Sequence, residues 1–180
     1  LFTNNNRACL LTPRVQPGCK REVFPGWVLV LNSWTLTWMD TWTWSPDGQS
    51  IVFAHFSDVG GVGKWSLYSV RVDGTEVTAL EEAGDGWQPS WSGSGDQIAF
   101  SSQRDGSWNI YVADADGGNL VRLTNNEGDN LEPVWSPGGD RIAFGSSRQG
   151  VFKIFVMDSD GGNVVATGQM GFPSSWVARP

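Results

Sequence analysis

Apolar and polar residues alternate along most of the chain, and the alternation recurs in three similar copies. In each copy two large apolar residues are separated by one small or aliphatic residue: Ile51 and Phe53, Ile98 and Phe100, Ile142 and Phe144. A second apolar run follows in each copy and begins at Trp65, Trp108 and Phe152. A period of two residues is typical of β-strands rather than helices. The pattern therefore predicts an all-β chain.

A tryptophan marks the same position in every copy. Trp44, Trp91 and Trp135 are spaced by 47 and 44 residues, and a partial fourth match places Trp176 another 41 residues along. This period, filled with short strands, is typical of a β-propeller blade. Asp-Gly and Gly-Gly turns supply the positive φ angles that tight hairpins need. Each copy is therefore predicted to be a four-stranded antiparallel blade, with these tryptophans in the innermost strands as its repeated core.

The repeats divide the chain into predicted blades. Blade one is expected at residues 41–87, blade two at 88–131 and blade three at 132–171. The strands of blade two are expected near 88–93, 97–103, 108–114 and 120–124. Those of blade three are expected near 132–137, 141–147, 152–158 and 163–168.

The two ends of the chain supply material for a fourth blade. Strand-like runs begin at Gly26 and Ser33 within residues 1–40, and residues 172–180 contain the run SSWVA. Together they make a composite blade, and a period of about 45 residues fits about four blades in the chain. The terminal strand can instead pair with a neighbouring copy, because the same hydrogen bonds form between chains. The sequence leaves ring closure and strand exchange open.

The repeat resembles a known family. The segment PVWSPGGDRIAFGSSRQGVFKIFVMDSDGGN and its two siblings look like the TolB-type propeller repeat, which is related to the WD-type propellers. The resemblance covers about residues 41–177 and implies a β-propeller fold. Two departures stand out: WSGSG in the second copy, and an insertion, SDVGGVGK, in the first.

Charge and hydropathy exclude two classes of partner. The net charge is -7, from 12 basic and 19 acidic residues, and no basic cluster is present. Nucleic-acid binding depends on attraction to phosphate, so we expect no nucleic-acid partner. No apolar run has the 18 or so residues that a membrane helix needs, so we expect no membrane span.

The two cysteines bear on the compartment. Cys9 and Cys19 bracket a short segment with two prolines and one glycine that can turn back on itself. A disulfide there would stabilise the fold by about 2–3 kcal/mol and would persist only in an oxidising compartment. This interpretation predicts an extracellular or periplasmic protein. The alternative is two buried thiols in a cytosolic protein.

No motif supports catalysis or a cofactor. VGGVGKWS has glycines before a lysine, but its spacing differs from that of a phosphate-binding loop. His55, Ser57 and Asp58 are close neighbours in one strand, whereas a triad usually draws on separate parts of the chain. The turns DADGG and DSDGG lack the distal glutamate of a calcium loop. We expect no enzyme, no metal and no cofactor.

Several tryptophans exceed what the repeat requires. Trp27, Trp34, Trp38 and Trp176 are candidate interface residues, because tryptophan anchors protein interfaces and stacks on sugars. Packing between blades is the alternative explanation.

The leading hypothesis is a non-catalytic interaction or structural module that associates with another protein or with copies of itself, as a ring or filament. An alternative is a glycan- or peptide-binding propeller that uses the loops SSQRDGSWN and TNNEGDNLEP. A weaker alternative is the gating propeller of a peptidase, although the chain has no Gly-x-Ser-x-Gly motif.

Overall fold

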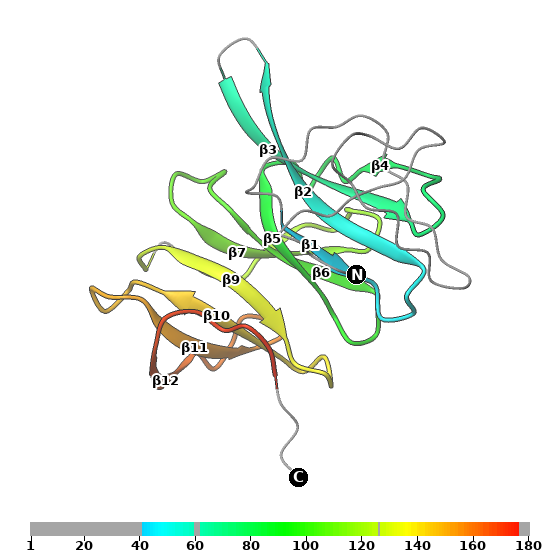
Figure 1. Ribbon diagram of the computed structural model, residues 1–180. Coiled ribbons are helices and arrows are strands. Elements are labelled where there is room, and N and C mark those ends of the chain that lie inside the picture. The colour runs from blue at the N-terminus through cyan, green and yellow to red at the C-terminus, as the bar shows by residue number, and fades with distance from the viewer. Residues whose placement is uncertain (1–40, 60–61, 126, 177–180) are drawn as a thin grey trace, which may run out of the picture.

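The computed structural model describes residues 41–59, 62–125 and 127–176 (Figure 1). Within that part of the chain, twelve strands form three four-stranded antiparallel sheets, and no helix is present. Each sheet is a meander in which consecutive strands are neighbours. The all-β fold class and the four-stranded antiparallel units are thereby confirmed.

The strands of each sheet follow one another directly along the chain. Sheet one contains β1 (Trp42–Trp44), β2 (Ser50–Val59), β3 (Val62–Arg71) and β4 (Thr78–Ala79). Sheet two contains β5 (Gly86–Trp91), β6 (Gln97–Ser102), β7 (Asn109–Asp114) and β8 (Val121–Arg122). Sheet three contains β9 (Asn130–Trp135), β10 (Arg141–Ser146), β11 (Lys153–Asp158) and β12 (Val165–Met170).

The repeated tryptophans occupy one position in the three sheets. Each ends the first strand of its sheet and is the cross-strand partner of the isoleucine near the start of the second. The pairs are Trp44 with Ile51, Trp91 with Ile98, and Trp135 with Ile142. The β5 strand contacts both β1 and β9, so the three first strands form the inner edge of the arc of sheets.

Two predicted boundaries differ from the structure. We expected blades two and three to begin at residues 88 and 132, but β5 and β9 begin two residues earlier, at Gly86 and Asn130. The pairing shifts register along both strands. Gln88 and Glu132, at the irregularities, have positive φ angles of 54° and 55°. Such bulges interrupt the two-residue alternation, so the sequence pattern does not identify the first residues of each strand.

The insertion in the first copy lengthens one hairpin. The aromatic pair Phe53 and Tyr68 encloses four more residues than the equivalent pair Phe100 and Tyr111. The extra residues extend β2 and β3, which stay paired from Ser50 with Arg71 to Val59 with Val62. The hairpin therefore projects beyond the rest of the sheet (Figure 1).

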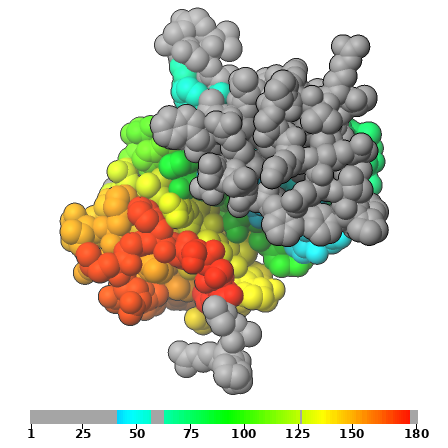
Figure 2. Space-filling model, in the orientation of Figure 1, coloured from blue at the N-terminus to red at the C-terminus, as the bar shows by residue number. Residues whose placement is uncertain are grey.

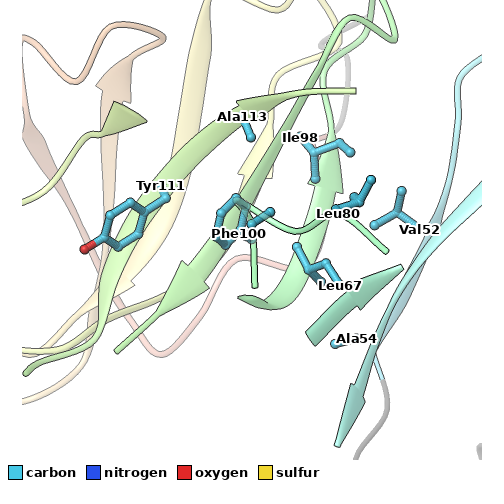
Figure 3. Packing of buried hydrophobic residues seen from close by; sticks show 9 residues of the cluster. Val52, Ala54, Leu67, Leu80, Ile98, Phe100, Tyr111 and Ala113 are labelled. Atoms are coloured by element: carbon cyan, nitrogen blue, oxygen red, sulfur yellow. The ribbon is translucent and has the colours of Figure 1, made fainter. Parts of the chain in front are cut away.

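The core lies between neighbouring sheets. Val52, Ala54 and Leu67 of sheet one face Ile98 and Phe100 of sheet two (Figure 3). The opposite face of sheet two packs on sheet three in a second cluster: Ala99, Ile110, Val112, Trp135, Ile142, Phe144, Phe155 and Met157. Full burial of a side chain of this size contributes about 1.5–3 kcal/mol, so face-to-face packing is the main force that holds the sheets together.

Some sequence predictions lie outside the described residues. Among them are the disulfide between Cys9 and Cys19 and the interface residues Trp27, Trp34 and Trp38. The N-terminal strands of the composite blade lie there too, so that blade stays a prediction. Trp176 is described: residues 172–176 form no strand, and the Trp176 indole N–H donates to the carbonyl of Val134 in β9 at 3.0 Å.

Candidate interaction site

Three equivalent residues meet at the inner edge of the sheets. Thr41, Gln88 and Glu132 each lie three residues before the repeated tryptophan of their sheet. The backbone N–H of Gln88 donates to Thr41 Oγ1 at 2.9 Å, and the backbone N–H of Glu132 donates to Gln88 Oε1 at 3.0 Å. The side chains of Thr41 and Gln88 therefore each accept a hydrogen bond from the equivalent backbone N–H of the next sheet, and the two bonds form a ladder across the three sheets.

The Gln88 amide is the centre of this ladder. Its Oε1 also accepts from the hydroxyl of Ser101 at 3.1 Å, and Ser101 Oγ in turn accepts from the Glu132 N–H at 3.1 Å. Burial raises the pKa of the Glu132 carboxyl, and a hydrogen bond with the Gln88 side chain offsets part of that increase. Glu132 is half-buried, so its carboxyl combines partial desolvation with access to solvent.

The backbone at Gln88 and Glu132 adopts a left-handed conformation. Residues other than glycine pay roughly 1–3 kcal/mol to adopt it, and such strain concentrates at functional sites. A proline follows each residue, Pro89 and Pro133, and both prolines are buried. The two positions therefore share the same local backbone shape.

Two equivalent arginines secure the loops around this inner edge. The Arg104 guanidinium lies 5.0 Å from the centre of the Tyr111 ring and donates to the carbonyls of Glu82, at 2.8 Å, and Gly84. Arg148 lies 4.7 Å from the Phe155 ring centre and forms a 2.8 Å ion pair with Glu127. Since both contacts are to loops that connect one sheet with the next, the arginines hold those loops in place.

Aromatic side chains form a row on the side of the connecting loops. The ring of Phe56 lies 5.1 Å from Trp65, Trp65 lies 5.7 Å from Trp87, and Trp87 lies 5.5 Å from Trp108. Trp65 and Trp108 begin equivalent apolar runs in sheets one and two, and Trp87 packs between them. These three tryptophans therefore pack between sheets one and two.

His55 and the aspartates of the hairpin turns, the candidates for catalysis or metal binding, contact neighbouring side chains of the fold. His55 is buried in β2, with its ring edge-on to Tyr68 at 6.3 Å. The Nδ2 groups of Asn119 and Asn163 donate to Asp114 and Asp158 at 2.6 Å within the hairpin turns. No group of three or more potential ligands gathers within the described part of the chain. Nor does any helix long and apolar enough to cross a membrane occur there.

Lys64 belongs to the glycine-containing segment VGGVGKWS, whose spacing differs from that of a phosphate-binding loop. It forms an ion pair with Asp85 at 3.3 Å. This pair connects the projecting hairpin with the loop before β5. Both side chains are about half exposed, so the contribution to stability is small.

Sequence reasoning missed the ladder and the arginines. A usable signal was present: Gln88 and Glu132, like Arg104 and Arg148, are separated by 44 residues, the repeat spacing of the second and third copies. Polar residues that recur at the repeat period are therefore as informative about equivalent positions in the blades as the repeated tryptophans.

Comparison with known proteins places the chain in a family. The family model of the TolB β-propeller domain matches residues 41–174. An uncharacterized protein of Agrobacterium fabrum is 34% identical over an alignment of 89 residues, and the match covers 44% of this chain and 29% of that protein.

Solved structures with a similar fold include TolB proteins. A protein assigned as a TolB from Agrobacterium tumefaciens has a TM-score of 0.64 and 30% identity, over 70% of this chain and 44% of that chain. TolB from Acinetobacter baumannii has a TM-score of 0.59 and 26% identity, over 70% of this chain and 31% of that one. Puromycin hydrolase, at 22% identity and a TM-score of 0.56 over 71% of this chain and 21% of its own, shares the fold. The chain spans less than half the length of each of these proteins. The chain belongs to the TolB β-propeller domain family.

Proposed function

We propose that the protein is a non-catalytic interaction module that binds an extended segment of a partner protein at the inner edge of its blades. The observation that carries this proposal is the convergence of Thr41, Gln88 and Glu132, one residue from each of three blades. Membership in a family of propeller domains supports an interaction role, although fold alone does not define function.

The chemistry of the ladder suits a polypeptide. Gln88 Oε1 is occupied by Ser101 and the Glu132 N–H, so the Gln88 amide offers its Nε2 donors and Glu132 offers its carboxylate as acceptor. A donor beside an acceptor matches the C=O and N–H groups of an extended backbone. Both side chains are only half-buried. A basic side chain on the partner would in addition pair with the Glu132 carboxylate. A polypeptide is therefore the ligand class that fits these groups.

A peptide library displayed on phage tests this site. Wild-type protein is expected to enrich a family of related peptides, and Glu132→Ala is expected to lose that enrichment. Gln149→Ala, whose exposed side chain accepts from Lys153 at 2.9 Å in the hairpin between β10 and β11, serves as the matched control. Enrichment that survives in Glu132→Ala, with both variants folded by circular dichroism, would place recognition elsewhere; no enrichment by the wild type would contradict peptide binding.

A second proposal concerns the fourth blade: we infer that it begins at Gly171 on the open face of blade three. The Gly171 N–H donates to the carbonyl of Phe152 at 3.0 Å, just as the Asn130 N–H donates to Trp108 at 2.9 Å when the chain enters blade three. The Phe172 ring packs on Phe152 at 4.7 Å. The Gly171 bond repeats the bond at the entry to blade three, and both contacts support a composite blade completed by the N-terminal region.

Deletion of Pro173 to Pro180 distinguishes ring closure from strand exchange. If the segment closes the chain's own propeller, the deletion lowers the free energy of unfolding and leaves the subunit state unchanged. If the segment pairs with a neighbouring copy, the wild type forms rings or filaments by electron microscopy, and the deletion abolishes them. The first outcome supports self-closure, and the second contradicts it.

We further propose a periplasmic or extracellular location, on the basis of the TolB family and the spacing of Cys9 and Cys19. Mass spectrometry of the unreduced protein checks this interpretation, because two free thiols would remove the cysteine argument.

A further inference from the structure

The outermost strand of blade three differs from those of the other two blades. β4 and β8 contain two residues each, whereas β12 contains six, and all six are exposed. β12 pairs only with β11 among the described strands, so its other edge presents backbone hydrogen-bonding groups to solvent. In Figure 2 the orange and red surface of this blade lies open at one side of the molecule.

This edge lacks most of the features that prevent edge pairing. Charged residues and prolines usually protect exposed edges, but residues 164–172 contain neither. Val165 is 62% exposed and Met170 is 65% exposed, one at each end of β12. A bulge at Gly168, with φ of 82°, is the single protective feature of the strand, and it leaves a short pairing segment on either side.

Charges beside β12 differ at its two ends. Lys153 of β11 is the cross-strand partner of Met170. At the other end, Asp158 ends β11 and Asp160 lies in the turn that follows, beyond the pair of Val156 with Val165. An antiparallel copy brings the basic end of one blade beside the acidic end of the other. A parallel copy would bring like charges together, so charge complementarity favours the antiparallel arrangement.

We propose that β12 pairs with β12 of a second copy of this chain, antiparallel and about a two-fold axis, to form a continuous eight-stranded sheet. Backbone hydrogen bonds supply the attraction, as in other complexes formed by strand addition. The pairing places Val165 of each copy near Met170 of the other, so each apolar side chain covers its counterpart. This contact uses the outer edge of blade three and is separate from both the peptide site and the fourth blade.

Sedimentation velocity over a range of protein concentrations tests the dimer. Wild-type protein is expected to show a reversible monomer to dimer transition. V165K/M170K places lysines opposite lysines, so its dissociation constant is expected to rise about tenfold or more. V165K/M170E places each lysine opposite a glutamate of the other copy and is expected to restore dimerisation. Rescue by opposite charge is a result that a purely structural defect would not produce.

Val121→Lys is the matched control. Val121 in β8 is 54% exposed, and it pairs with Val112 as Val165 pairs with Val156 in blade three. It is expected to leave the dimer unchanged. A wild type that stays monomeric at high concentration, or equal loss of dimer in V121K and V165K/M170K, would overturn the proposal. A dimer lost only on deletion of Pro173 to Pro180 would assign the contact to the terminal segment instead.

Discussion

The backbone N–H of Glu132 donates to the side-chain oxygen of Gln88 at 3.0 Å, although 44 residues separate them. One blade earlier, the N–H of Gln88 makes the same contact with Thr41 Oγ1. The same type of hydrogen bond therefore recurs between successive blades along the inner edge. Because each bond joins residues of two different blades, the ladder also helps to determine the relative orientation of neighbouring blades.

Removal of the Gln88 amide is expected to weaken the junction of blades two and three. Gln88→Ala leaves the Ser101 hydroxyl without its acceptor and the Glu132 N–H with Ser101 Oγ alone, which should lower the free energy of unfolding by about 1–3 kcal/mol. Chemical denaturation measures the change. Gln103→Ala, in an exposed loop, is the control and should stay within about 0.5 kcal/mol of wild type.

Glu132→Gln is expected to stabilise the protein at neutral pH. Burial raises the pKa of this carboxyl above its ordinary 4.5, so the folded state favours the protonated form. The associated stability is present at low pH and is lost as the pH rises through the folded pKa. Glutamine stays neutral and keeps an acceptor for Gln88. The advantage of Glu132→Gln over wild type should therefore shrink as the pH falls through the folded pKa and be lost below the ordinary value of 4.5, and an advantage independent of pH would contradict this explanation.

Gly145→Ala is expected to displace the segment that covers blade three. A Cβ at this position would lie 2.3 Å from Phe172 Cδ1, so the ring must move. Hydrogen exchange should then accelerate at the Gly171 amide, which is bonded to Phe152. Gly138→Ala is the control, because its Cβ would meet only the flexible Asp140 carboxylate, at 3.2 Å. Equal exchange in both variants would show that Phe172 does not hold the segment in place.

Arg104→Lys is expected to lower the free energy of unfolding, although the substitution keeps the positive charge. Lysine cannot stack on Tyr111 and at the same time donate to the two carbonyls that the planar guanidinium reaches. We expect a loss of about 1–3 kcal/mol in the free energy of unfolding. Arg141→Lys, at an exposed side chain 4.0 Å from Asp140, should change it by less than about 0.5 kcal/mol. Similar losses for both variants would mean that charge, not geometry, governs Arg104.

Much of the fold could be read from local patterns. The antiparallel pairing of neighbouring strands, such as that of Trp44 with Ile51 across the turn SPDG, could be predicted from alternation and turn chemistry, because both act over a few neighbouring residues. The bulges at Gln88 and Glu132 could not be read in this way. Their left-handed backbone interrupts the alternation, and neither residue type is an obvious choice for a positive φ angle.

By itself, the sequence determined that this chain forms repeated four-stranded antiparallel units, because strand periodicity and turn chemistry are local properties of the chain. Only the tertiary structure decided which polar groups converge. The ladder through Gln88, the arginine contacts to connecting loops and the cover of Phe172 over Gly145 all join residues of different repeats or strands. Such contacts depend on how the blades pack against one another, and no pattern within a single repeat specifies that packing.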